Sequence, residues 1–170
     1  MREVIRESMV QAPDLESARF ALTKIFRDLK ETQPDATIGF VSGIITSDGF
    51  EHIDRNLQML SVYAHQIKEG GLFGPYVISP ADVFNKPLFA KFDNAGAKEE
   101  HYLKFWREIL RSRLVDFVFM TPGWERSRGA SAEFLIAKQV RLNILYINKD
   151  GIIRPMIINK PSIMSANLPV

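Results

Sequence analysis

A single stretch in the second half of the chain carries most of the residues suited to chemistry. It runs from a turn through a serine to a glutamate: Pro122-Gly123-Trp124-Glu125-Arg126-Ser127-Arg128-Gly129-Ala130-Ser131-Ala132-Glu133. Glu133 is a carboxylate, which can act as a nucleophile or as a general base. Ser127, Gly129 and the backbone N–H groups of the turn can form an anion site where a helix begins, and Arg126 and Arg128 can add charge to it.

Two of these residues also have simpler interpretations. Ser127 can cap the helix that follows, and this is compatible with ligand binding because one hydroxyl can cap when no ligand is present. Trp124 can be a lid or packing residue, and the sharper alternative is that it stacks on a base.

Two strands and a helix must position this stretch. Residues 117–120 form a short apolar run without periodicity, which is typical of a parallel strand buried on both faces. A helix is predicted after the loop, and residues 144–147 predict the next strand. This βαβ unit puts the loop at the carboxyl end of its first strand, where open α/β sheets bind ligands. We expect Glu133 in the first turn of the helix, where the helix dipole favours its ionised form. The apolar positions at helical spacing are Ala132, Leu135, Ile136 and Val140.

The rest of the chain also alternates strands with helices. Short strands are predicted over 37–42 and 76–78, and helices are predicted over 14–30, from 53 to the glycines at 70–71, and through the apolar positions at 102–110. Residues 148–151 are a turn signal, followed by short strands over 152–153 and 156–158 that Pro155 separates. Residues 1–13 carry little signal. Gly43 follows the first strand, where a glycine lets a ligand approach the backbone or simply turns the chain.

Residues 81–97 are predicted to be a long connection of the kind that often forms a functional lid. The segment holds Asp93 and four large apolar side chains that need cover, Phe84, Leu88, Phe89 and Phe92. These side chains can stack on a planar ligand, enter a subunit interface or pack as ordinary core.

Composition excludes several classes of function. The 22 basic and 20 acidic side chains leave a formal net charge of +2 with no basic block, so nothing indicates a nucleic-acid partner. The lack of cysteine excludes disulfides, thiolate catalysis and zinc–sulfur sites. The histidines, His52, His65 and His101, lack metal-ligand spacing. No apolar run approaches a membrane span and residues 1–8 mix charges, so we expect a cytoplasmic protein with no membrane partner.

The central stretch resembles the nucleoside 2-deoxyribosyltransferase family and its relatives. The resemblance lies in Asp116 opening an apolar strand, in residues 122–130, and in Glu133 and Ala137 of the helix. Weaker echoes are Phe40-Val41-Ser42-Gly43 and Ile78-Ser79-Pro80-Ala81, so the matching residues span roughly 37–148 in family order. The relatives include 2'-deoxynucleoside 5'-monophosphate N-glycosidases, pyrimidine-nucleotide hydrolases and uncharacterised bacterial and phage proteins.

The resemblance implies N-glycosidic chemistry on a nucleoside or nucleotide. It assigns Glu133 the role of nucleophile at the anomeric carbon of the sugar, with expulsion of the base, and it assigns Ser127 a contact to the 5'-phosphate. Such cleavage passes through an oxocarbenium-like state that a carboxylate beneath the sugar can stabilise or trap. Water or a second base completes the reaction, and no metal or other cofactor is implied.

Two positions depart from the family pattern. Where family enzymes often have a tyrosine near the nucleophile, the matching residue is Phe40, which cannot donate a hydrogen bond. Family enzymes also often have an aspartate that touches the sugar or base, and the matching residue is Glu108. Its longer side chain can make the same contact, or the contact can be absent. The loop after Gly43 also lacks an arginine that some monophosphate hydrolases use. Glu108 or Asp93 could protonate the leaving base or orient the sugar.

We expect an α/β fold with three layers, a flavodoxin/Rossmann-like, mainly parallel sheet and an extra N-terminal helix. The predicted divisions are a helical extension at 1–36, a nucleoside 2-deoxyribosyltransferase-like domain at 37–160 and an irregular tail at 161–170. The resemblance implies a homodimer or larger homo-oligomer, to which Asn159 or Asn167 could contribute in trans.

Three functions remain open. The first is an N-glycosidase or base-exchanging deoxyribosyltransferase that acts through Glu133. The second is a module of the same fold that binds and senses a nucleotide without turnover, which Phe40 favours. The third, a cytokinin-type phosphoribohydrolase, normally has a Pro-Gly-Gly-x-Gly-Thr turn, and Pro122-Gly123-Trp124 does not match it.

Overall fold

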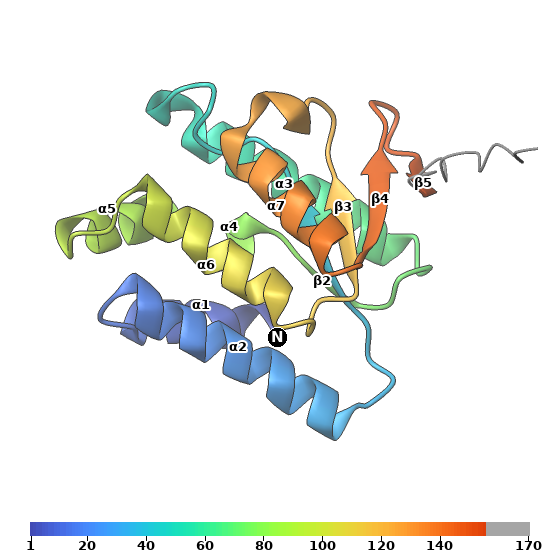
Figure 1. Ribbon diagram of the computed structural model, residues 1–170, viewed down its shortest axis with the longest axis horizontal. Coiled ribbons are helices and arrows are strands. Elements are labelled where there is room, and N and C mark those ends of the chain that lie inside the picture. Colours follow the sequence, from blue (N-terminus) through green and yellow to red (C-terminus); the bar gives the residue numbers. More distant parts are fainter. Residues whose placement is uncertain (156–170) are drawn as a thin grey trace, which may run out of the picture.

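The computed structural model describes residues 1–155 of the chain, which form a mixed α/β fold around a mainly parallel sheet (Figure 1). The strands of the sheet are β1 (Ile38–Ser42), β2 (Tyr76–Ile78), β3 (Phe117–Met120), β4 (Asn143–Ile147) and β5 (Ile153–Pro155). Their order is β2–β1–β3–β4–β5. The first four strands are parallel, and β5 runs antiparallel to β4 at the edge.

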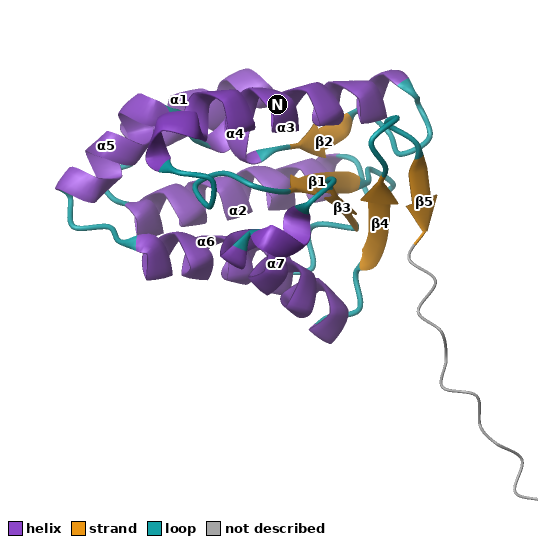
Figure 2. Ribbon diagram, turned by 90° about the horizontal axis from the view of Figure 1, so that it is seen from above, coloured by secondary structure: helices purple, strands orange, loops and turns teal. Residues whose placement is uncertain are grey.

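Helices connect these strands and pack on both faces of the sheet. The helices are α1 (Arg2–Gln11), α2 (Leu15–Thr32), α3 (Ile53–Glu69), α4 (Pro80–Val83), α5 (Lys86–Asn94), α6 (Glu99–Arg111) and α7 (Arg128–Gln139), with short 3₁₀ turns η1 (Phe50–His52) and η2 (Trp124–Arg126). Figure 2 shows the strands between α3 on one side and α6 and α7 on the other. Outside this arrangement, α2 packs on α6, and α1 packs on α2 and α4.

The strand order reverses between β1 and β3. From β1 the chain passes through α3 to β2 on one side, and it then returns through α6 to β3 on the other side. Parallel α/β sheets open a crevice at such a point, beyond the carboxyl ends of the strands. Ser42 ends β1 and Met120 ends β3, so the segments that follow these two residues flank the crevice.

Side chains along β1 point to the two faces of the sheet in turn. Val41 packs with Val77 and Phe119 in the cluster that α3 covers. Phe40 belongs to the cluster that includes buried residues of α6 and α7. Ser42 lies two residues beyond Phe40 and therefore faces α6 and α7 as well.

The strands predicted over 37–42, 76–78, 117–120 and 144–147 are confirmed as β1, β2, β3 and β4. The helix predicted from residue 53 is confirmed as α3, and the helix through residues 102–110 is confirmed as α6. The turn predicted at 148–151 joins β4 to β5, where Gly151 has a φ of 76°. The predicted strand over 156–158, Asn159, Asn167 and the tail at 161–170 lie outside the described residues.

The N-terminal region holds two helices where the sequence predicts one. The helix predicted over 14–30 is confirmed as α2, and Asp14 caps it by accepting a hydrogen bond from Ser17 N. Sequence reasoning misses α1, because its buried side chains Ile5 and Met9 make only one apolar pair. Both helices contribute to the same core cluster as the sheet, so segment 1–36 is packed on the α/β part.

The prediction that residues 81–97 form a long connection is wrong, because α4 and α5 occupy most of that segment. The Asp82 side chain accepts hydrogen bonds from Ser79 N at 2.8 Å and Ser79 Oγ at 3.1 Å, which caps α4. Asn85 caps α5 by accepting from Leu88 N at 3.0 Å. A capping residue close before a proline is a helix-start signal that the sequence analysis overlooked at both places. The four large apolar side chains are buried, as the core interpretation expects: Phe84, Leu88, Phe89 and Phe92.

The helix predicted after the central loop is confirmed as α7, but it buries a different face from the predicted one. Its buried side chains are Ala130, Glu133 and Ala137. Leu135, which the spacing predicts to be buried, is 63% exposed. Because α7 packs against α6, β3 and β4, the stripe that faces them sends Glu133 into the interior.

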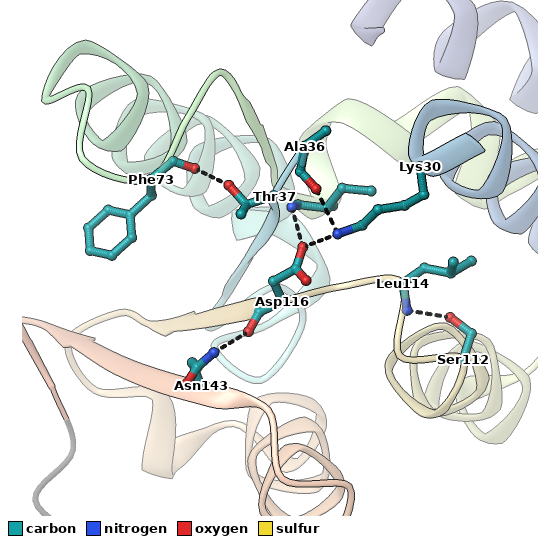
Figure 3. Close-up of polar contacts among 9 residues, drawn as sticks. Lys30, Ala36, Thr37, Phe73, Ser112, Leu114, Asp116 and Asn143 are labelled. Carbon is teal, nitrogen blue, oxygen red and sulfur yellow. Dashed lines mark hydrogen bonds and ion pairs between the residues drawn. The ribbon is translucent and has the colours of Figure 1, made fainter. Parts of the chain in front are cut away.

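Asp116 holds the amino ends of the central strands together (Figure 3). Its Oδ2 accepts hydrogen bonds from Ile38 N at 2.7 Å and from Lys30 Nζ at 2.6 Å. Lys30 also donates to Ala36 O at 2.7 Å. These contacts tie α2 to β1 and β3 at the end of the sheet opposite the crevice, so the role of Asp116 is structural.

Candidate functional site

A cavity of about 290 Å³ opens at the carboxyl ends of β1 and β3, close to the lower end of the roughly 300–1,000 Å³ range of small-molecule sites. Its walls come from the segment after β1, the first residue of α3, the residue after α4, the helices α5 and α6, and the first half of α7 together with its N-cap. The residues that line it are Gly43, Ile45, Thr46, Ser47, Ile53, Phe84, Phe89, Asp93, Glu99, Tyr102, Leu103, Trp106, Ser127, Arg128, Gly129, Ala130 and Glu133. A second, more open hollow of about 390 Å³ lies beside α2, α5 and α6, and its charged or titratable lining residues, Asp14, Glu16, His101 and Lys104, are all exposed.

Glu133 is the buried carboxylate of this cavity. Its side chain is 7% exposed, and Ser42 Oγ donates a hydrogen bond to Glu133 Oε2 at 2.5 Å. Burial raises the pKa of Glu133 to about 8, because removal from water disfavours the charged form, and the hydrogen bond from Ser42 opposes this rise.

The expectation that Glu133 lies in the first turn of the helix and is ionised there is wrong. Glu133 is the sixth residue of α7, which begins at Arg128, so it lies in the second turn. The favourable effect of the helix dipole falls off within the first turn. Desolvation therefore dominates, and the structure favours a carboxyl group that holds its proton at neutral pH.

The start of α7 forms one end of the cavity. Ser127 is the N-cap of the helix, and its Oγ accepts a hydrogen bond from Ala130 N at 3.3 Å. A Cβ at Gly129 would lie 3.7 Å from Ser127 Oγ and 3.9 Å from Leu103 Cδ2, so no close approach requires a glycine at this position. Arg128 lies at the rim, where its Nη1 is 3.3 Å from Glu99 Oε2. The capping interpretation of Ser127 is confirmed, and the same group of residues offers N–H groups and a cation to an anion.

Asp93 and Tyr102 line the cavity from α5 and α6. Tyr102 Oη donates a hydrogen bond to Asp93 Oδ1 at 2.9 Å. Burial and the neighbouring Asp93 both raise the pKa of Tyr102 above its usual value, so the phenol stays protonated and continues to donate. From the sequence, Tyr102 is predicted only as an apolar position of a helix. Its hydroxyl group is the feature that could have indicated a polar role at the site.

Aromatic side chains form much of the apolar lining of the cavity. Phe84 and Phe89 stack with their ring centroids 5.2 Å apart, and Trp106 packs edge-on against Phe84 at 6.0 Å. All three side chains are buried in the core and also line the cavity. The packing interpretation and the ligand-stacking interpretation of Phe84 and Phe89 are therefore compatible.

Position 43 lines the cavity, and it must be a glycine for a steric reason. A Cβ at this position would lie 2.1 Å from Thr121 Oγ1 and 2.7 Å from Leu60 Cδ2. Thr121 holds that place because its N and its Oγ1 both donate to Ser42 O at 3.0 Å. Glycine is needed because the ends of β1 and β3 approach each other closely here.

Phe40 and Trp124, which the sequence analysis considers as ligand contacts, do not line the cavity. Phe40 is fully buried and stacks on Trp106 with ring centroids 4.5 Å apart, so Trp106 covers it from the cavity side. Trp124 is buried against Phe134, with ring centroids 4.6 Å apart, which makes it a packing residue as the simpler interpretation expects. Neither side chain can stack on a base in this arrangement.

Glu108 lies away from the cavity on α6. The cavity-lining residues of α6 form a single stripe at positions 99, 102, 103 and 106. Position 108 is rotated by roughly 200° from position 106 around the helix. Glu108 instead pairs with Arg111 Nη1 at 3.4 Å, so of the two alternatives the structure favours the one in which Glu108 lacks the role of the family aspartate.

Within residues 1–155, no group of three or more histidine, aspartate or glutamate side chains is arranged to hold a metal ion. No helix in this part of the chain is long and apolar enough to cross a membrane.

Comparison with known proteins identifies the family of this chain. Neither the curated proteins nor the solved structures contain a match to this chain. A family model described as "Domain of unknown function (DUF4406)" matches residues 40–146, from β1 through β4, and thus includes Ser42, Asp93, Ser127 and Glu133. Since this match covers more than half of the chain, the protein belongs to the DUF4406 family.

Proposed function

We propose that this protein cleaves or exchanges the N-glycosidic bond of a nucleoside, a deoxynucleoside or a 5'-monophosphate of either, with Glu133 as nucleophile. The proposal places the chain in the nucleoside 2-deoxyribosyltransferase-like superfamily, and the strand order β2–β1–β3–β4–β5 agrees with a flavodoxin/Rossmann-like architecture. A homodimer or larger oligomer stays a prediction from the resemblance.

The observation that carries the proposal is the position of Glu133. It is a buried carboxylate at the floor of a cavity that has an anion-compatible helix start on one side and an aromatic wall on another. A phosphorylated sugar fits the first of these features, and a planar base fits the second. A nucleotide that used both features would bring its sugar close to Glu133, which supports the proposal.

In the proposed reaction, a covalent bond between Glu133 and the sugar forms in the first step and is broken in the second. A Glu133 carboxylate oxygen bonds to the anomeric carbon while the bond from that carbon to the base nitrogen breaks, and the electron pair leaves with the base. The base takes a proton from an acid at the cavity or from water. A water molecule then bonds to the anomeric carbon and loses its proton, while the ester bond to Glu133 breaks and restores the carboxylate. A second base in place of water gives base exchange.

Asp93 is the residue we assign to the leaving base or the sugar. Its Oδ1 accepts the hydrogen bond from Tyr102 at 2.9 Å, so its position is held from α6. Glu108 has no part in this assignment, because it does not line the cavity.

The pKa of Glu133 sets a condition on this mechanism. A nucleophilic carboxylate must be ionised, and with a pKa of about 8 the acid form dominates in the ligand-free protein at pH 7. Activity should therefore rise with pH towards about 8. The same protonated state supports an alternative function, in which the protein binds a nucleotide and does not turn it over.

The test is a panel of ribonucleosides, deoxyribonucleosides and their 5'-monophosphates, with free base measured by chromatography and with a second free base added to detect exchange. Glu133→Gln keeps the shape and removes the nucleophile. Glu108→Gln is the matched control, because it changes a carboxylate outside the cavity. Base release by the wild type and by Glu108→Gln but not by Glu133→Gln supports the proposal. Ligand binding without base release in any arm supports the sensing function instead.

A further inference from the structure

We infer that Ser42 is the positioning residue of Glu133: its hydroxyl holds Oε2 and leaves Oε1 as the oxygen that attacks the sugar. The inference rests on the proposed function and adds to it a residue that the sequence analysis did not assign. Among residues 1–155, the one hydrogen bond to the Glu133 carboxylate comes from Ser42 Oγ, at 2.5 Å.

The backbone of Ser42 is itself fixed. Its carbonyl oxygen accepts two hydrogen bonds from Thr121, one from N and one from Oγ1, each at 3.0 Å. Gly43, the next residue, can only be a glycine because its missing Cβ makes room for the Thr121 side chain. Ser42 is the last residue of β1, and its backbone is hydrogen-bonded to the residue that follows β3. Its side chain is fully buried.

The direction of the Ser42 side chain follows from the strand. Residues 38, 40 and 42 of β1 face α6 and α7. On that face Phe40 has no hydrogen-bond donor, and Ser42 has one O–H group, which points at Glu133 across the junction of β1 and α7. A rigid strand end thus sets the rotamer of a carboxylate on a helix.

Holding one oxygen has two effects on catalysis. It limits the rotation of the carboxylate, so that the position of the other oxygen is fixed as well. It also stabilises the ionised form, since a hydrogen bond donated to a carboxylate favours the charge. Loss of the hydroxyl should therefore reduce the rate of the chemical step more than it reduces substrate binding.

The test compares Ser42→Ala with Ser42→Cys, which keeps a weak donor of similar size. We expect Ser42→Ala to lower kcat by about 10- to 100-fold, which is the range for one hydrogen bond to a charged group, with KM changed by less than about 3-fold. Its pH–rate profile should shift to higher pH, and Ser42→Cys should recover part of both changes.

Ser79→Ala is the matched control. Ser79 is also a fully buried serine whose hydroxyl donates to a buried carboxylate, that of Asp82 at 3.1 Å, but it lies outside the cavity lining. It should lose stability without a shift of the pH–rate profile. An equal loss of kcat in Ser42→Ala and Ser79→Ala, or an unshifted profile in Ser42→Ala, overturns the inference.

A second readout separates this inference from the proposed function. The titration of Glu133 can be followed by NMR of protein labelled with carbon-13 in the glutamate carboxyl groups, with Glu133→Gln used to assign the signal. If the wild type releases no base from any substrate, the proposed function fails, and with it the catalytic role of Ser42. A higher pKa in Ser42→Ala than in the wild type would still support the hydrogen bond, and an unchanged pKa would overturn it.

Discussion

Arg128 and Glu99 pair at the rim of the cavity, with Arg128 Nη1 3.3 Å from both carboxylate oxygens of Glu99. Both side chains are largely exposed, one at the start of α7 and the other at the start of α6. In the ligand-free protein the guanidinium is therefore engaged with a carboxylate that a bound anion would have to replace. This competition suggests a simple way to find the anion end of the site.

Glu99→Gln should strengthen the binding of a 5'-monophosphate by about 2- to 5-fold, because the exposed ion pair that competes for Arg128 is lost. The corresponding nucleoside without phosphate should bind as before. Calorimetric titration of both ligands at low salt measures the difference. Glu100→Gln makes the same charge change one residue away, so an equal gain in both variants would point to general charge and not to release of Arg128.

Glu133→Gln should change how stability depends on pH. The folded-state pKa of Glu133, about 8, lies above its ordinary value of 4.5, so between these pH values the folded state holds a proton that the unfolded state has lost. The free energy of unfolding of the wild type therefore falls as pH rises, by about 1.4 kcal/mol per pH unit from this group. The free energy of unfolding of Glu133→Gln lacks this decrease. Relative to that of the wild type, it should therefore rise from pH 5 to pH 8.

Urea denaturation of the two proteins at pH 5, 6, 7 and 8 checks this sign, and the difference between them cancels the other titrating groups. Glu108→Gln is the control for the same chemical change at a half-buried carboxylate outside the cavity. A pH-independent difference between Glu133→Gln and the wild type would mean that Glu133 is not desolvated as the structure indicates.

Tyr102→Phe should raise KM by about 5-fold, because Asp93 loses the hydrogen bond that holds it at the cavity. Stability should fall by at most about 1 kcal/mol, since this bond is partly exposed. Tyr76→Phe is the control: it removes a phenol that donates to Gln33 Oε1 at 2.7 Å far from the cavity lining. A similar KM in the two variants would remove Asp93 from the proposed site.

Asp116→Ala should destabilise the fold by about 1–3 kcal/mol and leave kcat unchanged. The variant removes the acceptor of both Ile38 N and Lys30 Nζ, and each donor is partly buried. Asp116→Asn keeps an oxygen for Ile38 N and should cost less. Thermal melting gives the order of the three proteins, and a loss of kcat at a temperature well below melting would contradict a purely structural role.

Local patterns carried the prediction of most elements. The apolar runs of β1 and β3 and the spacing along α3 and α6 are read from neighbours a few residues apart, so the sequence was sufficient for them. The prediction failed where the signal was short or mixed: α1 buries one apolar pair, and α4 and α5 are capped helices inside an aromatic-rich segment. Ser127 and Glu133 were found because a turn, a helix start and a carboxylate stand close together in the chain.

The strand–helix alternation, the position of the loop before α7 and the residue types in this loop can all be read from the order of the residues. Which residues meet at the site depends on how the elements pack. Ser42 and Glu133 are 91 residues apart, and they meet because β1 lies beside β3 and α7 packs against β3. The raised pKa of Glu133 depends on the burial of its side chain, and the exclusion of Glu108 depends on which side of α6 faces the cavity. Contacts and desolvation of this kind arise from the packing of distant segments, which spacing along the chain does not encode.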